Sequence, residues 1–121
     1  MIIGIGLDIV DIARWQRSLE QIADQVFTPD ELAACADRVD RVDALAARFA
    51  AKEACLKALN AGIRGGGLRQ VEVVADPSGA PNIRLSGELA DRARERCVER
   101  AHVSLSHHEG FAAAVVVLEG M

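Results

Sequence analysis

Three short stretches of the sequence carry side chains that could act together in one reaction. In the first stretch, Asp8 interrupts residues 1–10, where most side chains are apolar. A carboxylate inside such a strand costs on the order of a few kcal/mol unless it finds a partner. Asp8 is therefore either part of a binding site or a purely structural group, placed at an exposed strand end or in a buried salt bridge.

The second stretch is the sequence RFAAKEACLK at residues 48–57. Glu53 and Lys57 are four residues apart, which is the spacing of an ion pair on an exposed helix face. Ala46 and Ala50 share their stripe of the helix, and small side chains there let a helix approach a strand closely. In that arrangement Glu53 and Lys57 would instead line a cleft floored by the first strand.

Asp8 and Glu53 together have the chemistry of a magnesium site. Mg²⁺ keeps several waters and is usually held by one or two carboxylates and by substrate phosphates. Lys57, one turn from Glu53, could pair with a phosphate oxygen as a point charge. The residue types are thus compatible with metal-assisted chemistry on a phosphate-bearing substrate, with the simple helix ion pair as the alternative.

The third stretch is HVSLSHH at residues 102–108. Alternation along a strand puts His102, Ser104 and Ser106 on one face and His107 on the other. Ser106 and His107 are neighbours in sequence, but they point in opposite directions, and the chain has no G-x-S-x-G motif. A serine hydrolase is therefore disfavoured, and a solvated strand face ending in a turn is the alternative to a binding site.

The apolar spacing predicts the elements that must position these residues, in the order β-α-α-α-β-β-α-β-β. Thr28-Pro29-Asp30-Glu31 is a capping box with proline at the first helical position, and Gly65–Gly67 is predicted to be a loop beside the site. The fold class is α+β, a mixed or antiparallel sheet with helices packed on one side. The predicted strands are residues 1–10, 71–74, 82–85, 102–107 and 111–118, and the helices are 12–26, 29–35, 42–60 and 87–100.

Composition narrows the class of protein. The chain has 121 residues, of which 50% are hydrophobic, so we expect a single domain over residues 1–121 with its own core. A net charge of −4 argues against a nucleic-acid binder. We find neither a signal peptide nor an apolar run long enough for a membrane, so we expect a soluble, cytoplasmic protein. Cys35, Cys55 and Cys97 are widely spaced and are expected to be buried free thiols.

Taken in order, these stretches resemble a known family. The chain is similar over nearly its whole length to the short, single-domain class of holo-[acyl-carrier-protein] synthases, which are 4′-phosphopantetheinyl transferases. The matching pieces are GIGLDIV at 4–10, FTPDEL at 27–32, RFAAKEACLKA at 48–58 and HVSLSH at 102–107, with the strand 71–74 before an Asp-x-x-Gly-x-Pro turn. The resemblance implies the 4′-phosphopantetheinyl transferase fold.

The resemblance also implies a reaction and a set of site residues. The family moves the phosphopantetheine arm of coenzyme A onto a serine of an apo acyl carrier protein and releases adenosine 3′,5′-bisphosphate. Asp8, Glu53 and Lys57 would be the catalytic residues, with Asp8 and Glu53 holding Mg²⁺ and Lys57 contacting a phosphate. The group that removes the serine proton is either Glu53 or a metal-bound water. Coenzyme A would be bound by four residues: Arg48, Lys57, Ser106 and His107.

Partners follow from the resemblance as well. Carrier proteins are acidic, so Arg14 and Arg17 on the first helix would dock the carrier, although two ordinary solvated arginines are the alternative. The family forms homotrimers with coenzyme A between neighbouring subunits, and its usual role is in fatty acid biosynthesis. We expect no nucleic-acid or membrane partner.

The chain departs from the family pattern in small ways. Phe111 stands where a tyrosine is expected, His108 doubles the histidine, and Gly65–Gly67 is unusually rich in glycine. Two other classes of function remain open. One is a binding module that keeps the trimer without turnover, although the intact Asp8, Glu53 and Lys57 argue against it. The other is a metal-dependent hydrolase in which water replaces the carrier serine.

Overall fold

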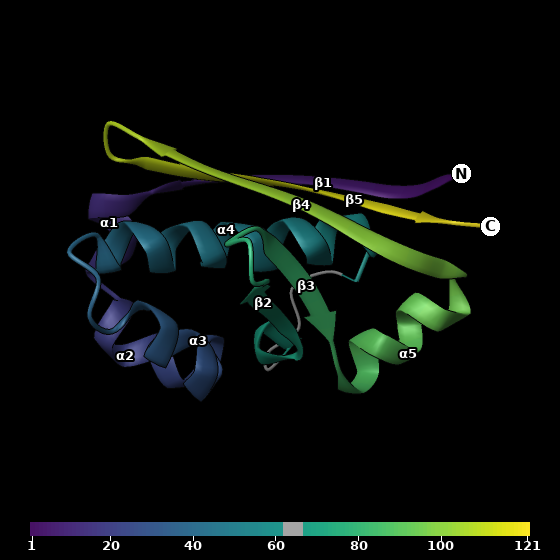
Figure 1. Cartoon of the computed structure of the whole chain (residues 1–121), viewed down its shortest axis with the longest axis horizontal. Helices are drawn as coiled ribbons and strands as arrows, with labels where there is room; N and C mark the ends of the chain where they lie inside the picture. The colour runs from purple at the N-terminus through teal and green to yellow at the C-terminus, as the bar shows by residue number, and fades with distance from the viewer. Residues whose placement is uncertain (62–66) are drawn as a thin grey trace.

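The computed structural model of the chain describes residues 1–61 and 67–121. Within these ranges the chain forms five strands, five α-helices and a short 3₁₀ helix, η1 (Figure 1). The bounds are β1 Ile2–Asp11, α1 Ile12–Gln16, α2 Leu19–Val26, α3 Pro29–Cys35, α4 Arg41–Ala58, η1 Gly67–Gln70, β2 Val71–Ala75, β3 Pro81–Leu85, α5 Gly87–Glu95, β4 Val98–His108 and β5 Phe111–Gly120.

The strands form two antiparallel sheets. β1, β5 and β4 make a three-stranded sheet in the order β1-β5-β4, and β2 pairs with β3 in a hairpin. The helices and the hairpin lie on one side of the three-stranded sheet (Figure 1). The α+β class with antiparallel strands and helices on one side is therefore confirmed.

Helix α4 is the centre of the core. Its alanine-rich sequence leaves it buried over most of its circumference, because it packs under β1 and β5 on one side and meets α1, α3 and β2 on the others. The sheet covers it with the inward side chains of β5, which alternate with outward ones as a strand half-exposed to solvent requires. Those inward residues are Ala112, Ala114, Val116 and Leu118.

β1 and α4 approach each other so closely that no side chain fits between them at two places. A Cβ atom on Gly6 would lie 1.7 Å from the carbonyl oxygen of Ala54, and one on Gly4 would lie 2.0 Å from that of Ala58. Glycine is required here because of the contact. Asp8 is the next residue on the same face of the strand, so its carboxylate also lies against α4.

Arg92 of α5 and Arg96, the residue that follows α5, bind the C-terminal end of α4, whose last carbonyl groups have no partner within the helix. Arg92 donates to the carbonyl oxygens of Leu59 and Asn60 at 2.8 and 2.7 Å. Arg96 donates to Ala58 O at 3.0 Å and to Ile3 O of β1 at 3.1 Å. α5 therefore ties the end of α4 to the start of β1.

The local signals read from the sequence are confirmed at two places. Thr28 and Glu31 form the capping box at the start of α3, with each side chain accepting a hydrogen bond from the other's backbone N–H. Glu109 and Gly110, both with positive φ (47° and 85°), connect β4 and β5 in a two-residue turn.

Two predicted helices are wrong in extent. The helix expected over 12–26 is two helices, because Ile12 packs in the cluster under the sheet whereas Leu19 and Val26 pack in a second cluster around Phe27. The helix expected to reach about residue 100 ends at Glu95. The chain turns at Cys97, where φ is 62°, and Val98 then pairs with Gly120.

The expected burial of the three cysteines is wrong for Cys97, which lies in this turn. Cys35 and Cys55 are buried free thiols as expected, and burial raises the pKa of Cys55 to about 12, but Cys97 is exposed. Of the predicted Gly65–Gly67 loop, Gly67 begins η1, and Gly65 and Gly66 lie outside the described residues. In the part of the chain that the structure describes, no helix has the length and apolar character needed to cross a membrane.

Replacing Gly6 tests the β1–α4 contact. Gly6→Ala places a methyl group 1.7 Å from Ala54 O, so strand and helix must separate, and we expect a loss of about 3 kcal/mol or more in unfolding free energy. Gly67→Ala is the matched control, since its Cβ would meet nothing nearer than Leu89 at 3.9 Å. Urea denaturation measures both variants. Equal stability of the two would contradict the close contact.

Candidate active site

Asp8 and Lys57 meet across the β1–α4 contact. Lys57 Nζ lies 3.0 Å from Asp8 Oδ1 and donates a second hydrogen bond, of 2.9 Å, to Leu7 O. Asp8 is largely buried, with 18% of its side chain exposed, while Lys57 is 54% exposed. Lys57 is therefore engaged by the strand rather than by Glu53, its expected partner on the helix.

Glu53 is half-buried beside this pair. Burial raises the pKa of Glu53, the nearby charge of Asp8 raises it further, and Lys57 partly offsets both effects. Within residues 1–61 and 67–121 the Glu53 carboxylate has no hydrogen bond or ion pair. Two carboxylates thus share a small space with one lysine, and this arrangement favours a bound cation.

Asp8 and Glu53 line the same open cleft, which has a volume of about 550 Å³. Its other side is α1, which contributes Arg14 and Trp15, and Phe49 of α4 contacts the indole with ring centroids 5.6 Å apart. Arg14 therefore stands at the edge of the carboxylate site. Arg17 is exposed after α1 and is not part of the cleft lining.

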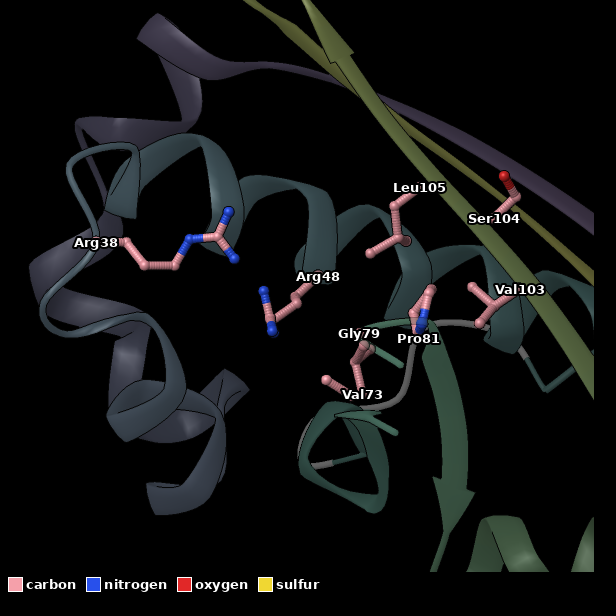
Figure 2. Close-up of a pocket in the computed structure, with 9 residues that line it drawn as sticks. Arg38, Arg48, Val73, Gly79, Pro81, Val103, Ser104 and Leu105 are labelled. Atoms are coloured by element: carbon pink, nitrogen blue, oxygen red, sulfur yellow. The ribbon is translucent and has the colours of Figure 1, made fainter. Parts of the chain in front are cut away.

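Arg48 belongs to a second cavity, of about 250 Å³, between α4, the β2–β3 hairpin and β4. Its side chain is buried, and its Nε has no partner among the described residues. Figure 2 shows the guanidinium groups of Arg38 and Arg48 extending into the same space. Arg38 also donates from Nε and Nη2 to the Asp40 carboxylate at 2.8 and 2.9 Å, whereas Arg48 Nε is unused. A buried guanidinium group with an unused donor beside a cavity is suited to bind an anion such as phosphate.

The predicted residues of β4 lie near this cavity without lining it. Ser106 is on the exposed outer face, and His107 is at the end of the strand, with Nδ1 3.7 Å from Asp43 Oδ2. β4 lines the cavity with Val103, Ser104 and Leu105 instead. The Ser104 hydroxyl points away from it (Figure 2).

The two cavities lie on different sides of α4. Arg48 and Glu53 are five residues apart, which corresponds to about 140° around a helix with 3.6 residues per turn. Arg48 faces the β2–β3 hairpin, whereas Glu53 faces β1 and α1. Within one chain, the anion site and the carboxylate site therefore open in different directions.

Comparison with known proteins decides the family. Residues 4–116 match the 4′-phosphopantetheinyl transferase superfamily. The chain is 46% identical to a holo-[acyl-carrier-protein] synthase of Anaeromyxobacter sp. (strain K), over 99% of this chain and 98% of that protein. The chain belongs to the holo-[acyl-carrier-protein] synthase family of 4′-phosphopantetheinyl transferases. The resemblance read from the sequence is thereby confirmed.

Solved structures of this synthase family share the fold. The holo-[acyl-carrier-protein] synthase of Neisseria meningitidis superposes with a TM-score of 0.88 at 36% identity, covering 98% of this chain and 99% of that one. The Helicobacter pylori synthase, crystallised in complex with coenzyme A, gives a TM-score of 0.79 at 35% identity, covering 95% and 99%. The transferase fold expected from the resemblance is therefore confirmed.

Sequence reasoning missed three side chains around the two cavities. Arg38 lies in a charged stretch that has no periodicity, and only the fold brings it to Arg48. Trp15 of α1 lines the carboxylate cleft. Lys52 is completely buried against Glu31. Its place in an alanine-rich helix was the available signal.

The raised pKa of Glu53 leads to a stability prediction in the absence of divalent cations. Because the folded state holds this proton more tightly than the unfolded chain, stability falls as pH rises from the ordinary carboxyl pKa through the raised one. Glu53→Gln removes this penalty, so we expect a melting temperature about 2 °C or more above that of the parent at pH 8. The advantage should disappear below pH 4.

Thermal denaturation followed by circular dichroism measures the difference. Glu95→Gln, which replaces an exposed carboxylate on α5, is the control and should change little at either pH. A Glu53→Gln variant that melts below the parent at pH 8 would show that the carboxylate is stabilised by a partner in the folded protein.

Proposed function

We propose that the chain transfers the 4′-phosphopantetheine group of coenzyme A to a serine hydroxyl of an apo acyl carrier protein. The serine oxygen forms a bond to the β-phosphorus, the bond from that phosphorus to the bridging oxygen breaks, and adenosine 3′,5′-bisphosphate leaves. The supporting observation is that Asp8 and Glu53 line one cleft and that Lys57 forms an ion pair with Asp8. This arrangement occurs in a chain whose full-length relatives are named for this synthesis.

The two carboxylates fit the Mg²⁺ that the reaction implies. Among the described residues, no group of three or more His, Cys, Asp or Glu side chains is placed to hold a metal alone. Two carboxylates completed by substrate phosphates and water are the usual magnesium arrangement, and the Glu53 carboxylate accepts no hydrogen bond from residues 1–61 and 67–121. Bound between Asp8 and Glu53, the ion would supply positive charge to the pyrophosphate oxygens.

Lys57 and Glu53 have distinct roles in this proposal. Lys57 is half-exposed, and its ammonium group can turn from Asp8 towards a phosphate oxygen and stabilise the charge that develops there. Glu53 would hold the cation with Asp8, and either Glu53 or a water bound to that cation would accept the proton of the serine hydroxyl.

The cavity at Arg48 is the proposed site for the nucleotide end of coenzyme A. Arg48 supplies the positive charge, Arg38, which is paired with Asp40, adds a second guanidinium group, and Val73 and Leu105 supply apolar walls. His107 stands close to the start of α4, where its imidazole can reach a phosphate that projects from this cavity. Ser106, one residue before it, remains a proposed contact on the outer face of β4.

The carrier protein would dock on α1. Arg14 stands at the edge of the carboxylate cleft, and both Arg14 and Arg17 are exposed. An acidic partner lying along α1 would therefore bring its serine to Asp8 and Glu53. We propose fatty acid biosynthesis as the setting and the cytoplasm as the location, with residues 1–121 acting as one domain.

Intact mass spectrometry of an apo acyl carrier protein tests the transfer. After incubation with the chain, coenzyme A and Mg²⁺, the carrier should gain the mass of one phosphopantetheine group. A chelator, or Glu53→Gln, should lower the rate by about 100-fold or more, because the charge stabilisation of the transition state is lost. Charge reversal at Arg14 and Arg17 should raise the KM for the carrier without changing the KM for coenzyme A.

The alternative functions give different results in the same assay. Release of adenosine 3′,5′-bisphosphate without any carrier present would indicate a hydrolase, in which water replaces the serine. Binding of coenzyme A with no gain of mass on several carriers would indicate a binding module without turnover. Either result would contradict the transferase proposal.

We also propose that the chain acts as a homotrimer with its active sites between subunits. The outer face of β1 is apolar and open, with Ile5, Leu7 and Ile9 exposed by 61%, 63% and 68%. Val115 and Val117 of β5 extend it, so that a second copy could cover a continuous apolar surface. A subunit boundary here would let the carboxylate site of one copy face the Arg48 cavity of a neighbour.

Mixing two inactive variants tests the shared site. Arg48→Ala and Glu53→Gln each damage one half of it, so each homotrimer should be inactive. Trimers assembled from both should regain activity at the boundaries that pair an intact Arg48 with an intact Glu53. Sedimentation should show three times the chain mass of 12.9 kDa. A monomer, or mixed trimers without activity, would contradict the proposal.

A further inference from the structure

A buried ion pair holds the β2–β3 hairpin against α4. Lys52 Nζ lies 2.6 Å from Glu31 Oε1, and neither side chain is exposed to solvent. The same ammonium group donates to the carbonyl oxygens of Leu68 at 3.0 Å and Val71 at 2.5 Å. Its three donors are therefore all used, and two of them hold the backbone of η1 and β2.

Glu31 completes the connection from the other side. Its Oε2 accepts a hydrogen bond of 3.0 Å from Val73 N in β2, and its Oε1 also accepts one from Thr28 N. Thr28 Oγ1 in turn donates to Glu72 Oε2 at 2.6 Å. The two buried charges thus hold Val71 and Val73 of β2, and the Thr28 hydroxyl holds Glu72 between them.

The stability of the folded protein alone does not account for this buried ion pair. A buried ion pair is usually no more stabilising than apolar side chains of similar volume, and burial lowers the pKa of Lys52. Alanines surround it on α4 and would accept an apolar neighbour. The ion pair instead fixes the position of β2, because charged hydrogen bonds restrict geometry far more narrowly than apolar contacts do.

The position of β2 matters because this strand is a wall of the Arg48 cavity. Val73 and Ala75 of β2 line that cavity, and Arg48 is one helical turn before Lys52 on α4. The distance between the guanidinium group and the opposite wall is therefore set by the Lys52–Glu31 contact.

We propose that Lys52, through Glu31, is a positioning residue that sets the width of the Arg48 cavity and hence the affinity for the nucleotide end of coenzyme A. The inference rests on the proposed function of that cavity. Lys52 itself touches no substrate, because it is fully buried and its donors are occupied.

Calorimetric titration with adenosine 3′,5′-bisphosphate, without metal, tests the inference. We expect Lys52→Met to raise the Kd about tenfold or more, since β2 is no longer fixed opposite Arg48. Arg96→Met is the matched control. It also removes one side chain's hydrogen bonds to two carbonyl oxygens at α4, but it lies away from the cavity, so its Kd should stay within about twofold of the parent.

A second readout separates positioning from general destabilisation. In the transfer assay the KM for coenzyme A should rise with the Kd in Lys52→Met, while kcat changes by less than about threefold. All measurements are made where circular dichroism shows folded protein. If Lys52→Met does not fold, Glu31→Gln, which keeps the shape of the side chain, decides in the same way and should also raise the Kd.

The outcomes distinguish the inference from the function on which it rests. A folded Lys52→Met (or, in its place, Glu31→Gln) with the parental Kd would overturn the positioning role and leave the proposed function intact. An equal loss of affinity in Arg96→Met would also overturn it, because general destabilisation would then explain both variants. A parent chain that does not bind the nucleotide would refute the proposed nucleotide site, and the inference would fail with it.

Discussion

The close contact between β1 and α4 determines where the carboxylate site lies. At Gly4 and Gly6 no side chain larger than a hydrogen atom fits against the carbonyl oxygens of Ala58 and Ala54. A strand exposes every second residue on one face, so the residue after these glycines on that face is Asp8. Its carboxylate therefore reaches α4 where Lys57 can pair with it. The geometry of the carboxylate site follows from the absence of side chains beside it.

Helix α4 presents its charged site residues on two different sides. One side carries Glu53 and Lys57 towards β1, and the other carries Arg48 towards the hairpin. Arg92 and Arg96 hold the end of the helix, and Lys52 holds its middle to β2. Held at its C-terminal end and at its middle, α4 fixes the positions of the two cavities relative to each other within one chain.

Local patterns predicted much of this structure from the sequence. The capping box at Thr28, the two-residue turn after His108 and the apolar face of each strand depend on residues close in sequence. The joint site of Asp8, Glu53 and Lys57 was predicted from the alanines that let the helix approach the strand and from the resemblance to a known family. Arg38 beside Arg48 and Arg92 beside Leu59 could not be predicted, since each pairing depends on how distant segments pack. The division of residues 12–26 into two helices has the same origin, because two different clusters receive their apolar side chains.

Lys52 and Glu53 show where the limit of sequence reasoning lies. They are adjacent, oppositely charged and set among alanines, and a helical pattern would treat both as surface residues. Lys52 is paired with Glu31 and donates to two carbonyl oxygens, whereas Glu53 makes no hydrogen bond to the described residues. Burial and the charge of Asp8 raise the pKa of Glu53, and Lys57 offsets these effects only in part. A protein that needed only stability would not keep an unneutralised carboxylate beside another one. The unfavourable placement of Glu53 therefore indicates that this part of the fold binds a ligand. The well-paired Lys52 indicates a structural role in holding the elements around that site.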